Sequence, residues 1–524
     1  MGNRQGYELR NSEVIDLNID DILNIVKTYD TFASTTASPS ETLIVTFKDN
    51  NVTYDNVVIE KAFLKIFINP EVSYFRTPWS NNSVSFSYAG LYEFKVYRDR
   101  IKPLVDTGVC PFFVKFLGGN EILTYEQLKQ LLQTRTDFNE NNLLRNLLYL
   151  YEDRNNRPAL NQNNPSLQDV MQSSNYLQTS TNYFNIHTSL TTIRFVFSML
   201  EAIDKSTTIQ LHNMLQNNSR STNRTITDET WIVIFQIALA CYALFQSKVT
   251  HNDLHANNVF VETLTESTQY IFKVQNMYYT FTTNKKAKLF DFDRAYSSVH
   301  GVNPMINSVP RFCESLSVCN KNIEQIDIVK VLCSLSFYYP NHRANIIDLF
   351  IPGNIPPGER TTLQQYWMYV FSQENPSCLL QQQRNQSVPR INYNKLLNFE
   401  AIISNIASKT NEIKTSTTID THNVNSNNLY VIEQENFDNL GNVILDKVTA
   451  KKVNYLVQSQ NAKMETLTER LKMLTPENAD TKTLNAEIEA LKNRVKQLQD
   501  ELESREFMIA SLQEMRRCND ILTL

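Results

Sequence analysis

The feature that most constrains this chain is a polar segment at residues 251–258 that is followed at once by an apolar run. The polar segment is His-Asn-Asp-Leu-His-Ala-Asn-Asn, and the apolar residues 259–261 are typical of a strand. A second apolar run, residues 288–290, leads into the triplet Asp-Phe-Asp at 291–293. Residues 262–285 between the two clusters are predicted to form a long hairpin. Both clusters therefore place polar side chains next to strands that could hold them rigidly.

The residue types in these clusters are those that phosphoryl transfer requires. A carboxylate must orient the attacking hydroxyl group and accept its proton, and Asp253 is the candidate for this catalytic base. Nucleotide phosphates need Mg²⁺, a hard cation that prefers oxygen ligands. Asn258 offers an amide oxygen and Asp291 a carboxylate, so we predict that both residues bind magnesium.

The pattern His-x-Asp-x-x-x-x-Asn with a downstream Asp-Phe-Asp resembles the catalytic loop and metal-binding motif of the protein-kinase superfamily. The resemblance spans about residues 25–400. It implies an α+β, bilobal fold with a small β-rich N-lobe and a helical C-lobe, and it implies ATP and Mg²⁺ as cofactors. The form His-x-Asp-Leu-His-x-x-Asn is similar to haspin-like kinases and to the divergent kinases of large nucleocytoplasmic DNA viruses, including iridovirus-type viruses. A viral kinase would be expected in the cytoplasm of the infected host cell, with the virion as an alternative.

Four other parts of the chain extend the resemblance. Residues 62–67 (Ala-Phe-Leu-Lys-Ile-Phe) resemble the Val-Ala-Ile-Lys strand, which would make Lys65 the ligand of the α- and β-phosphates. Glu93 would then be its partner from a helix at about residues 90–105. Residues 194–201 resemble the strand and hinge that present backbone groups to adenine. Asp327 would be the helix aspartate that braces the catalytic loop, with an N-terminal helix cap as its alternative role.

The chain also departs from the family pattern. No Gly-x-Gly-x-x-Gly precedes Lys65, and the only candidate for a phosphate-covering loop is residues 30–40, in which small residues replace the glycines. Their Cβ atoms restrict close approach to phosphates. Asp293 stands where the family has glycine, and His255 stands where serine/threonine kinases usually have lysine. No Ala-Pro-Glu follows Asp291, so regulation by activation-loop phosphorylation is not supported.

Apolar patterning predicts the elements that would build this fold. A long helix is expected at residues 228–246, with Asp228 as its cap, and residues 323–400 are expected to be mainly helical. Strands are predicted at residues 42–47, 57–68, 111–117 and 193–200.

Composition divides the chain further. The last segment has apolar residues in alternating four-three spacing, with Ile and Val on one heptad position and Leu on the other, which favours a parallel coiled-coil dimer. We expect a homodimer or a hetero-partner through this segment, the alternative being one amphipathic helix packed on the globular part. The expected parts are an N-terminal extension (1–25), an N-lobe (26–200) with a helical, Asn-rich insertion at about 120–190, a C-lobe (201–404), a polar linker (405–458) and the coiled coil (459–518).

Charge and cysteine usage exclude several classes of function. The net charge of -5 gives no electrostatic footprint for nucleic acid. The seven cysteines form no Cys-x-x-Cys pair, which disfavours a disulfide framework or zinc site and favours a reducing compartment. The most apolar run, residues 231–245, is too short to span a bilayer.

Three functions are consistent with these features. The first is a serine/threonine protein kinase that transfers the γ-phosphate of ATP to protein hydroxyl groups. The second is a small-molecule phosphotransferase, because aminoglycoside and choline kinases also carry a His-x-Asp-Leu-His-x-x-Asn loop. The third is a pseudokinase scaffold that dimerises through the coiled coil, which the missing glycine loop favours. The complete set of Lys65, Asp253, Asn258 and Asp291 favours the first.

Overall fold

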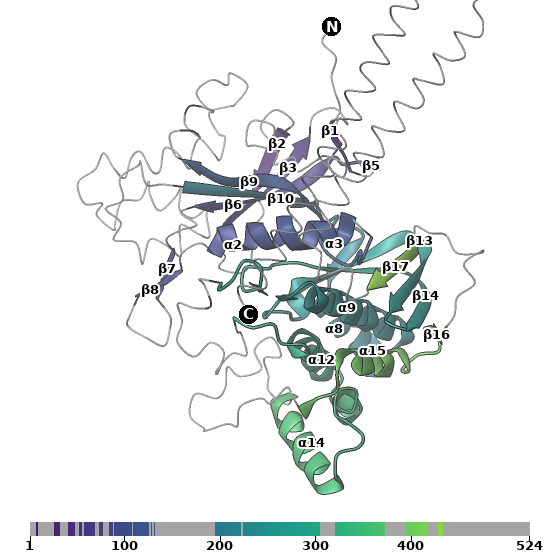
Figure 1. Ribbon diagram of the computed structural model, residues 1–524. Coiled ribbons are helices and arrows are strands. Elements are labelled where there is room, and N and C mark those ends of the chain that lie inside the picture. Colours follow the sequence, from purple (N-terminus) through teal and green to yellow (C-terminus); the bar gives the residue numbers. More distant parts are fainter. Residues whose placement is uncertain are drawn as a thin grey trace, which may run out of the picture. The chain divides into compact units, whose positions relative to one another are not determined.

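The computed structural model shows a mixed α+β protein built on antiparallel sheets (Figure 1). The expected coiled coil at 459–518 lies outside the described residues, as do residues 131–190 of the expected insertion and residues 418–427 and 433–458 of the expected linker. The structure describes residues 7–8, 26–31, 40–47, 52–54, 57–68, 73–76, 83–86, 89–106, 108–124, 127, 130, 194–221, 224–303, 306, 320–371, 395–417 and 428–432.

The first large sheet is antiparallel and has the strand order β2-β3-β6-β10-β9. In β6, Ala62, Leu64 and Ile66 are fully buried while Lys65 alternates with them on the other face, as the period of two in a strand requires. The five strands are β2 (Val26–Thr31), β3 (Ser40–Phe47), β6 (Lys61–Ile68), β10 (Arg194–Glu201) and β9 (Phe116–Thr124).

Three of the predicted strands are confirmed, since residues 42–47, 57–68 and 193–200 fall largely on β3, β6 and β10. The prediction at residues 111–117 was wrong in its bounds, because β9 begins only at Phe116. Phe113 instead forms an isolated parallel bridge with Leu289, so this apolar stretch connects the first sheet to another part of the core. Smaller pairings join β1 (Tyr7–Glu8), β4 (Val52–Tyr54) and β5 (Val57–Val58), and also β7 (Ser73–Arg76) and β8 (Ser83–Phe86).

A continuous helical run lies along the first sheet, which confirms the helix predicted at residues 90–105 (Figure 1). It consists of α2 (Ala89–Val96), the π-helical turn η1 (Tyr97–Ile101) and α3 (Lys102–Asp106). Gly90 allows a close approach to the sheet, because a Cβ atom there would lie 2.3 Å from Cγ of Phe67. This approach brings α2, which carries Glu93, close to the strand that carries Lys65.

The second large sheet is built on a long hairpin of β13 (Val259–Val274) and β14 (Met277–Leu289), as predicted. β11 (Thr208–Gln210) and β17 (Leu429–Ile432) pair with β13, and β16 (Lys414–Ser416) pairs with β14. β16 and β17 lie within the stretch expected to be linker. The first compact unit runs to Leu440, so the folded chain continues past the boundary expected at residue 404.

The helix α9 (Asp228–Gln246) has the bounds predicted for it and forms the centre of the core. The expectation that this apolar segment is too short to span a bilayer was wrong, because the whole helix has sufficient length and mean hydropathy. Residues 230–244 are nevertheless all buried in the protein, as in the core helix of a globular fold. The predicted cap was wrong. Thr227 is the N-cap, and its side-chain oxygen accepts a hydrogen bond from the backbone N–H of Thr230. Asp228 lies in the first turn, where its charge complements the helix dipole.

One buried polar side chain fixes α9 to the hairpin. The Gln236 amide donates to the Lys285 carbonyl oxygen and accepts from the Ala287 N–H, both at 2.8 Å.

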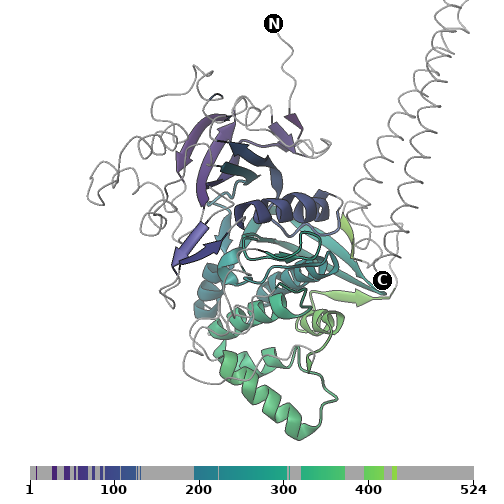
Figure 2. The same cartoon turned by 60° about the vertical axis from the view of Figure 1, so that its left-hand side comes forward.

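Two further helices, α12 (Ile326–Tyr338) and α15 (Phe399–Ala407), pack on α9 (Figures 1 and 2). The expectation of mainly helical structure within residues 323–400 is confirmed in the described residues. In that range the structure has α12, α13 (Arg343–Ile347), α14 (Pro357–Phe371) and the start of α15. Another helix, α8 (Leu211–Ser221), precedes α9 in the chain.

Candidate active site

The two polar clusters of the sequence meet at one end of the long hairpin. Val259 pairs with Leu289, so Asn258 and Phe290 are neighbours just beyond the paired strands. The Phe290 N–H donates to the Asn258 carbonyl oxygen at 3.2 Å. On the other side, β12 (Val249–Thr250) pairs with β15 (Tyr296–Ser297). Two strand pairings thus enclose the polar loop and the Asp-Phe-Asp triplet between them.

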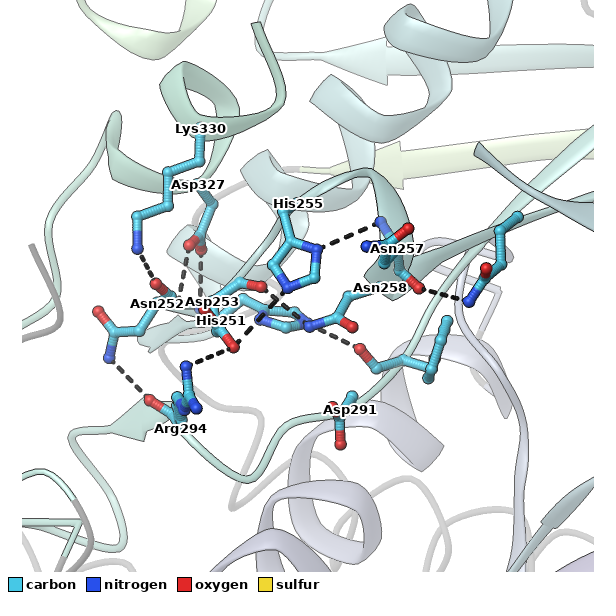
Figure 3. Close-up of polar contacts among 12 residues, drawn as sticks. His251, Asn252, Asp253, His255, Asn257, Asn258, Asp291, Arg294, Asp327 and Lys330 are labelled. Carbon is cyan, nitrogen blue, oxygen red and sulfur yellow. Dashed lines mark hydrogen bonds and ion pairs between the residues drawn. The ribbon is translucent and has the colours of Figure 1, made fainter. Parts of the chain in front are cut away.

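The loop backbone is held by Asp327 at the start of α12 (Figure 3). Its carboxylate oxygens accept hydrogen bonds from the N–H groups of His251 and Asn252, at 2.7 and 2.8 Å. Lys330, one turn further along α12, donates to the Asn252 carbonyl oxygen. Asn252 adopts a left-handed backbone conformation, with φ of 65°, which asparagine tolerates better than most residues. Asp327 therefore makes hydrogen bonds to the loop for which it was predicted to be a brace.

His251 has a structural place beneath the loop. Its Nε2 atom lies 2.9 Å from the Phe290 carbonyl oxygen, and its ring packs against Phe292 with ring centroids 4.7 Å apart. The side chain is fully buried. His251 therefore links the loop to the segment that carries Asp291.

Lys65 joins three segments that are far apart in the sequence. Its ammonium nitrogen lies 2.8 and 2.9 Å from the two Glu93 carboxylate oxygens and 3.2 Å from Oδ1 of Asp291. The Glu93 side chain is 1% exposed and that of Lys65 11%. Burial alone would lower the pKa of Lys65, but the carboxylates of Glu93, Asp291 and Asp293 raise it well above its ordinary value. The predicted Lys65–Glu93 pair is present, and the lysine carries its positive charge.

Asp291 is presented by an unusual backbone conformation. Its φ of 70° lies in the left-handed region, and its N–H donates to the Tyr97 hydroxyl group at 3.1 Å. The side chain is 36% exposed. Burial raises the pKa of the carboxyl group, but the Lys65 ammonium outweighs this effect and holds the pKa below its usual range. Asp291 thus presents an ionised, accessible carboxylate.

Asn258 and Asp291 offer the types of oxygen donor that magnesium prefers. The Asn258 amide nitrogen donates to the Asp253 carbonyl oxygen at 3.0 Å, so the amide oxygen is the atom suited to a cation. Among the described residues, no three or more His, Cys, Asp or Glu side chains are grouped so that they could hold a metal. An amide and a carboxylate oxygen suit a cation that keeps waters and takes its other ligands from nucleotide phosphates.

The side chain of Asp253 contacts a residue that the sequence analysis did not single out. Oδ2 of Asp253 accepts a hydrogen bond from Nη1 of Arg294 at 2.9 Å, and Nε2 of His255 lies 3.9 Å from the same oxygen (Figure 3). Burial lowers the pKa of His255, against the smaller effect of Asp253, which favours the neutral imidazole. No spacing in the sequence marks Arg294, because its approach to the loop depends on the turn after Phe292.

The expected hinge and phosphate-covering loop are described in part. At the end of β10, Glu201 accepts a hydrogen bond from the Lys115 N–H at 2.8 Å and forms an ion pair with Lys288 of β14 at 3.1 Å. These contacts tie the end of the first sheet to the hairpin. Residues 30–31 and 40 lie on β2 and β3, which pair as neighbours, while residues 32–39 lie outside the described residues.

A scan against protein-family models found no match to this sequence, and a search of curated proteins found no significantly similar one. Function is therefore inferred from the residues and their geometry.

Proposed function

We propose that this protein is an ATP-dependent serine/threonine protein kinase that uses Mg²⁺ to transfer the γ-phosphate to protein hydroxyl groups. One observation carries the proposal. Lys65 contacts both Glu93 and Asp291, residues separated from it by 28 and 226 positions. A cation poised between a buried carboxylate and a metal-binding carboxylate is the arrangement that binds and orients nucleotide phosphates in kinases.

The bilobal fold is part of the proposal. The five-stranded sheet with α2 would form the N-lobe, and the hairpin with α9 and its neighbours would form the C-lobe. The tie between Glu201 and Lys288 supports a hinge at the end of β10, where backbone groups would meet adenine. The loop between β2 and β3 would cover the phosphates.

Each side chain has a role in binding. Lys65, fixed by Glu93, binds the α- and β-phosphates. Asn258 and Asp291 hold magnesium, which when bound neutralises phosphate charge and orients the nucleotide. The buried Glu93 carboxylate keeps Lys65 charged and in place.

Asp253 acts on the acceptor. It orients the serine or threonine hydroxyl group and accepts its proton. The hydroxyl oxygen forms a bond to the γ-phosphorus, the bond from that phosphorus to the β–γ bridging oxygen breaks, and ADP leaves with the electron pair. Asp327 holds the loop so that Asp253 stays within reach. Catalysis then consists of positioning and electrostatic stabilisation.

Partners and location are proposed on the sequence features alone. Residues 459–518 would provide a coiled coil for a second copy or another protein. A kinase of the viral type would act in the host cytoplasm or be packaged in the virion.

Substrate profiling tests the proposal. Wild-type protein is incubated with radiolabelled ATP and Mg²⁺, alone and with a basic protein, an aminoglycoside or choline. We expect label in the protein itself or in the basic protein. Label only in the aminoglycoside or choline would instead establish a small-molecule phosphotransferase.

The pseudokinase alternative has one observation in its favour, namely the absence of glycine from residues 30–40. A thermal-shift measurement with Mg·ATP addresses it. The proposal predicts that nucleotide stabilises the wild-type protein and that Asp291→Ala loses most of this effect. Neither transfer nor binding in the wild-type protein would leave the scaffold as the better account.

A further inference from the structure

Arg294 occupies a place that the proposed chemistry has not yet used. Its Nη1 atom lies 2.9 Å from Oδ2 of Asp253, and its side chain is 40% exposed while that of Asp253 is 14% exposed. The Asn252 side chain donates to the Arg294 carbonyl oxygen at 3.0 Å, so the arginine backbone is fixed to the same loop (Figure 3). The guanidinium group is thus held beside Asp253 and is partly exposed to solvent.

Arg294 connects the two polar clusters. Its guanidinium group contacts Asp253 of the polar loop, while its backbone follows Asp291 by three positions in the chain. The proposed catalytic base therefore has a cation from the segment that carries a proposed metal ligand.

A side chain beside Asp253 that binds a phosphate group must carry a positive charge at physiological pH. His255, the other nitrogen base beside Asp253, has a pKa lowered by burial, which favours its neutral form. It cannot supply the charge that a lysine at its position would provide. An arginine stays protonated at every physiological pH, and its planar fork of N–H donors can bind a carboxylate along one edge and a phosphate along another.

We propose that Arg294 is a catalytic residue that bridges Asp253 and the transferred phosphoryl group. One N–H holds the carboxylate, and other N–H groups donate to the γ-phosphoryl oxygens as negative charge is redistributed in the transition state. Lys65 serves the non-reacting phosphates at the other end of the site. This inference rests on the proposed kinase function and adds to it the group that stabilises the transferred phosphoryl.

The test compares three variants by binding and by rate. Arg294→Ala removes the group and Arg294→Lys keeps only a point charge. Arg360→Ala is the matched control, because Arg360, which lies on α14, also forms a 2.9 Å ion pair with an aspartate, Asp348. Calorimetry with Mg²⁺ measures the affinity of each protein for ADP and for a non-hydrolysable ATP analogue. Radiolabel transfer gives kcat and KM, with and without added millimolar guanidinium.

The bridging role predicts a combined result. Arg294→Ala lowers kcat by about 100-fold, the usual effect of removing one transition-state donor. It also removes the preference for the ATP analogue over ADP, and guanidinium restores part of the rate. Arg294→Lys keeps part of the preference and transfers about tenfold more slowly than wild type. Arg360→Ala resembles wild type in every measurement.

Other results would overturn the inference separately from the function. Wild-type protein that neither binds Mg·nucleotide nor transfers phosphate would remove both. Active wild-type protein with an unchanged Arg294→Ala variant would remove the inference alone. A slow Arg294→Ala variant that keeps its preference for the ATP analogue would reduce Arg294 to a residue that only positions Asp253. If Arg294→Ala fails to fold, Arg294→Lys is used instead. A wild-type preference of Arg294→Lys for the ATP analogue over ADP would then contradict the bridging role.

Discussion

The ammonium nitrogen of Lys65 lies 3.2 Å from Oδ1 of Asp291, although 226 positions separate the two residues in the chain. One comes from β6 of the first sheet, and the other follows β14 of the second. The same ammonium group neutralises Glu93, whose carboxylate is almost completely buried. A single cation therefore connects the two sheets electrostatically at the candidate site.

Removing that cation should affect stability as well as activity. In Lys65→Met the Glu93 carboxylate stays buried without its closest cation, and breaking a buried ion pair in this way costs about 3 to 5 kcal/mol. We expect urea unfolding to show such a loss. The double variant Lys65→Met/Glu93→Gln should recover part of it, because no buried charge is then left unpaired. Equal stability of the single and double variants would contradict a buried pair.

Removing Asp327, which holds the loop, should lower the rate of transfer with little effect on nucleotide affinity. Asp327→Ala leaves the N–H groups of His251 and Asn252 without their acceptor, at a cost of about 1 to 3 kcal/mol for each buried group. The loop that carries Asp253 then loses its fixed geometry. We expect kcat to fall at least about tenfold while the KM for ATP changes little.

Asp228→Ala is the control for the brace, since Asp228 also lies in the first turn of a helix but is exposed. It should retain wild-type kcat. An equal loss of kcat in both variants would show that the effect is one of general stability.

His255 should make folding stability depend on pH. Burial lowers the pKa of His255 below its ordinary value of 6.5. Between these two pKa values the unfolded chain binds a proton that the folded chain does not, so stability falls as the pH decreases through this window and is fully present above pH 6.5. The melting temperature of His255→Gln should therefore decrease less than that of wild type when the pH is lowered from 7.5 to 5.5. An identical loss in both proteins would show that His255 does not contribute.

Much of the candidate site could be predicted because its residues come from segments with clear sequence patterns. Asp253 and Asn258 precede one apolar strand, and Asp291 follows another. The strand alternation around Lys65 and the helix around Glu93 were visible in the same way. The pattern could not give distances, but it identified the segments that the fold brings together.

The features that escaped prediction depend on tertiary contacts. Arg294 is one arginine among many until the turn after Phe292 brings it to Asp253. β16 consists of Lys414, Thr415 and Ser416, which have no apolar pattern and form a strand only because the edge of β14 offers hydrogen-bond partners. The cap of α9 was assigned one residue too late, because Thr227 and Asp228 are both good caps and only the backbone conformation distinguishes them.

The most direct test of the central claim is phosphate transfer by an Asp253→Asn variant. Asparagine keeps the size of the side chain but cannot accept the hydroxyl proton. Transfer of radiolabelled phosphate from ATP is measured for wild type, Asp253→Asn and the control Asp228→Asn, an exposed aspartate in the first turn of α9. Binding of Mg·ATP is measured in parallel. The account predicts active wild-type and control proteins, with transfer by Asp253→Asn reduced at least about 100-fold and nucleotide binding retained. Undiminished transfer by Asp253→Asn would contradict its role as the catalytic base.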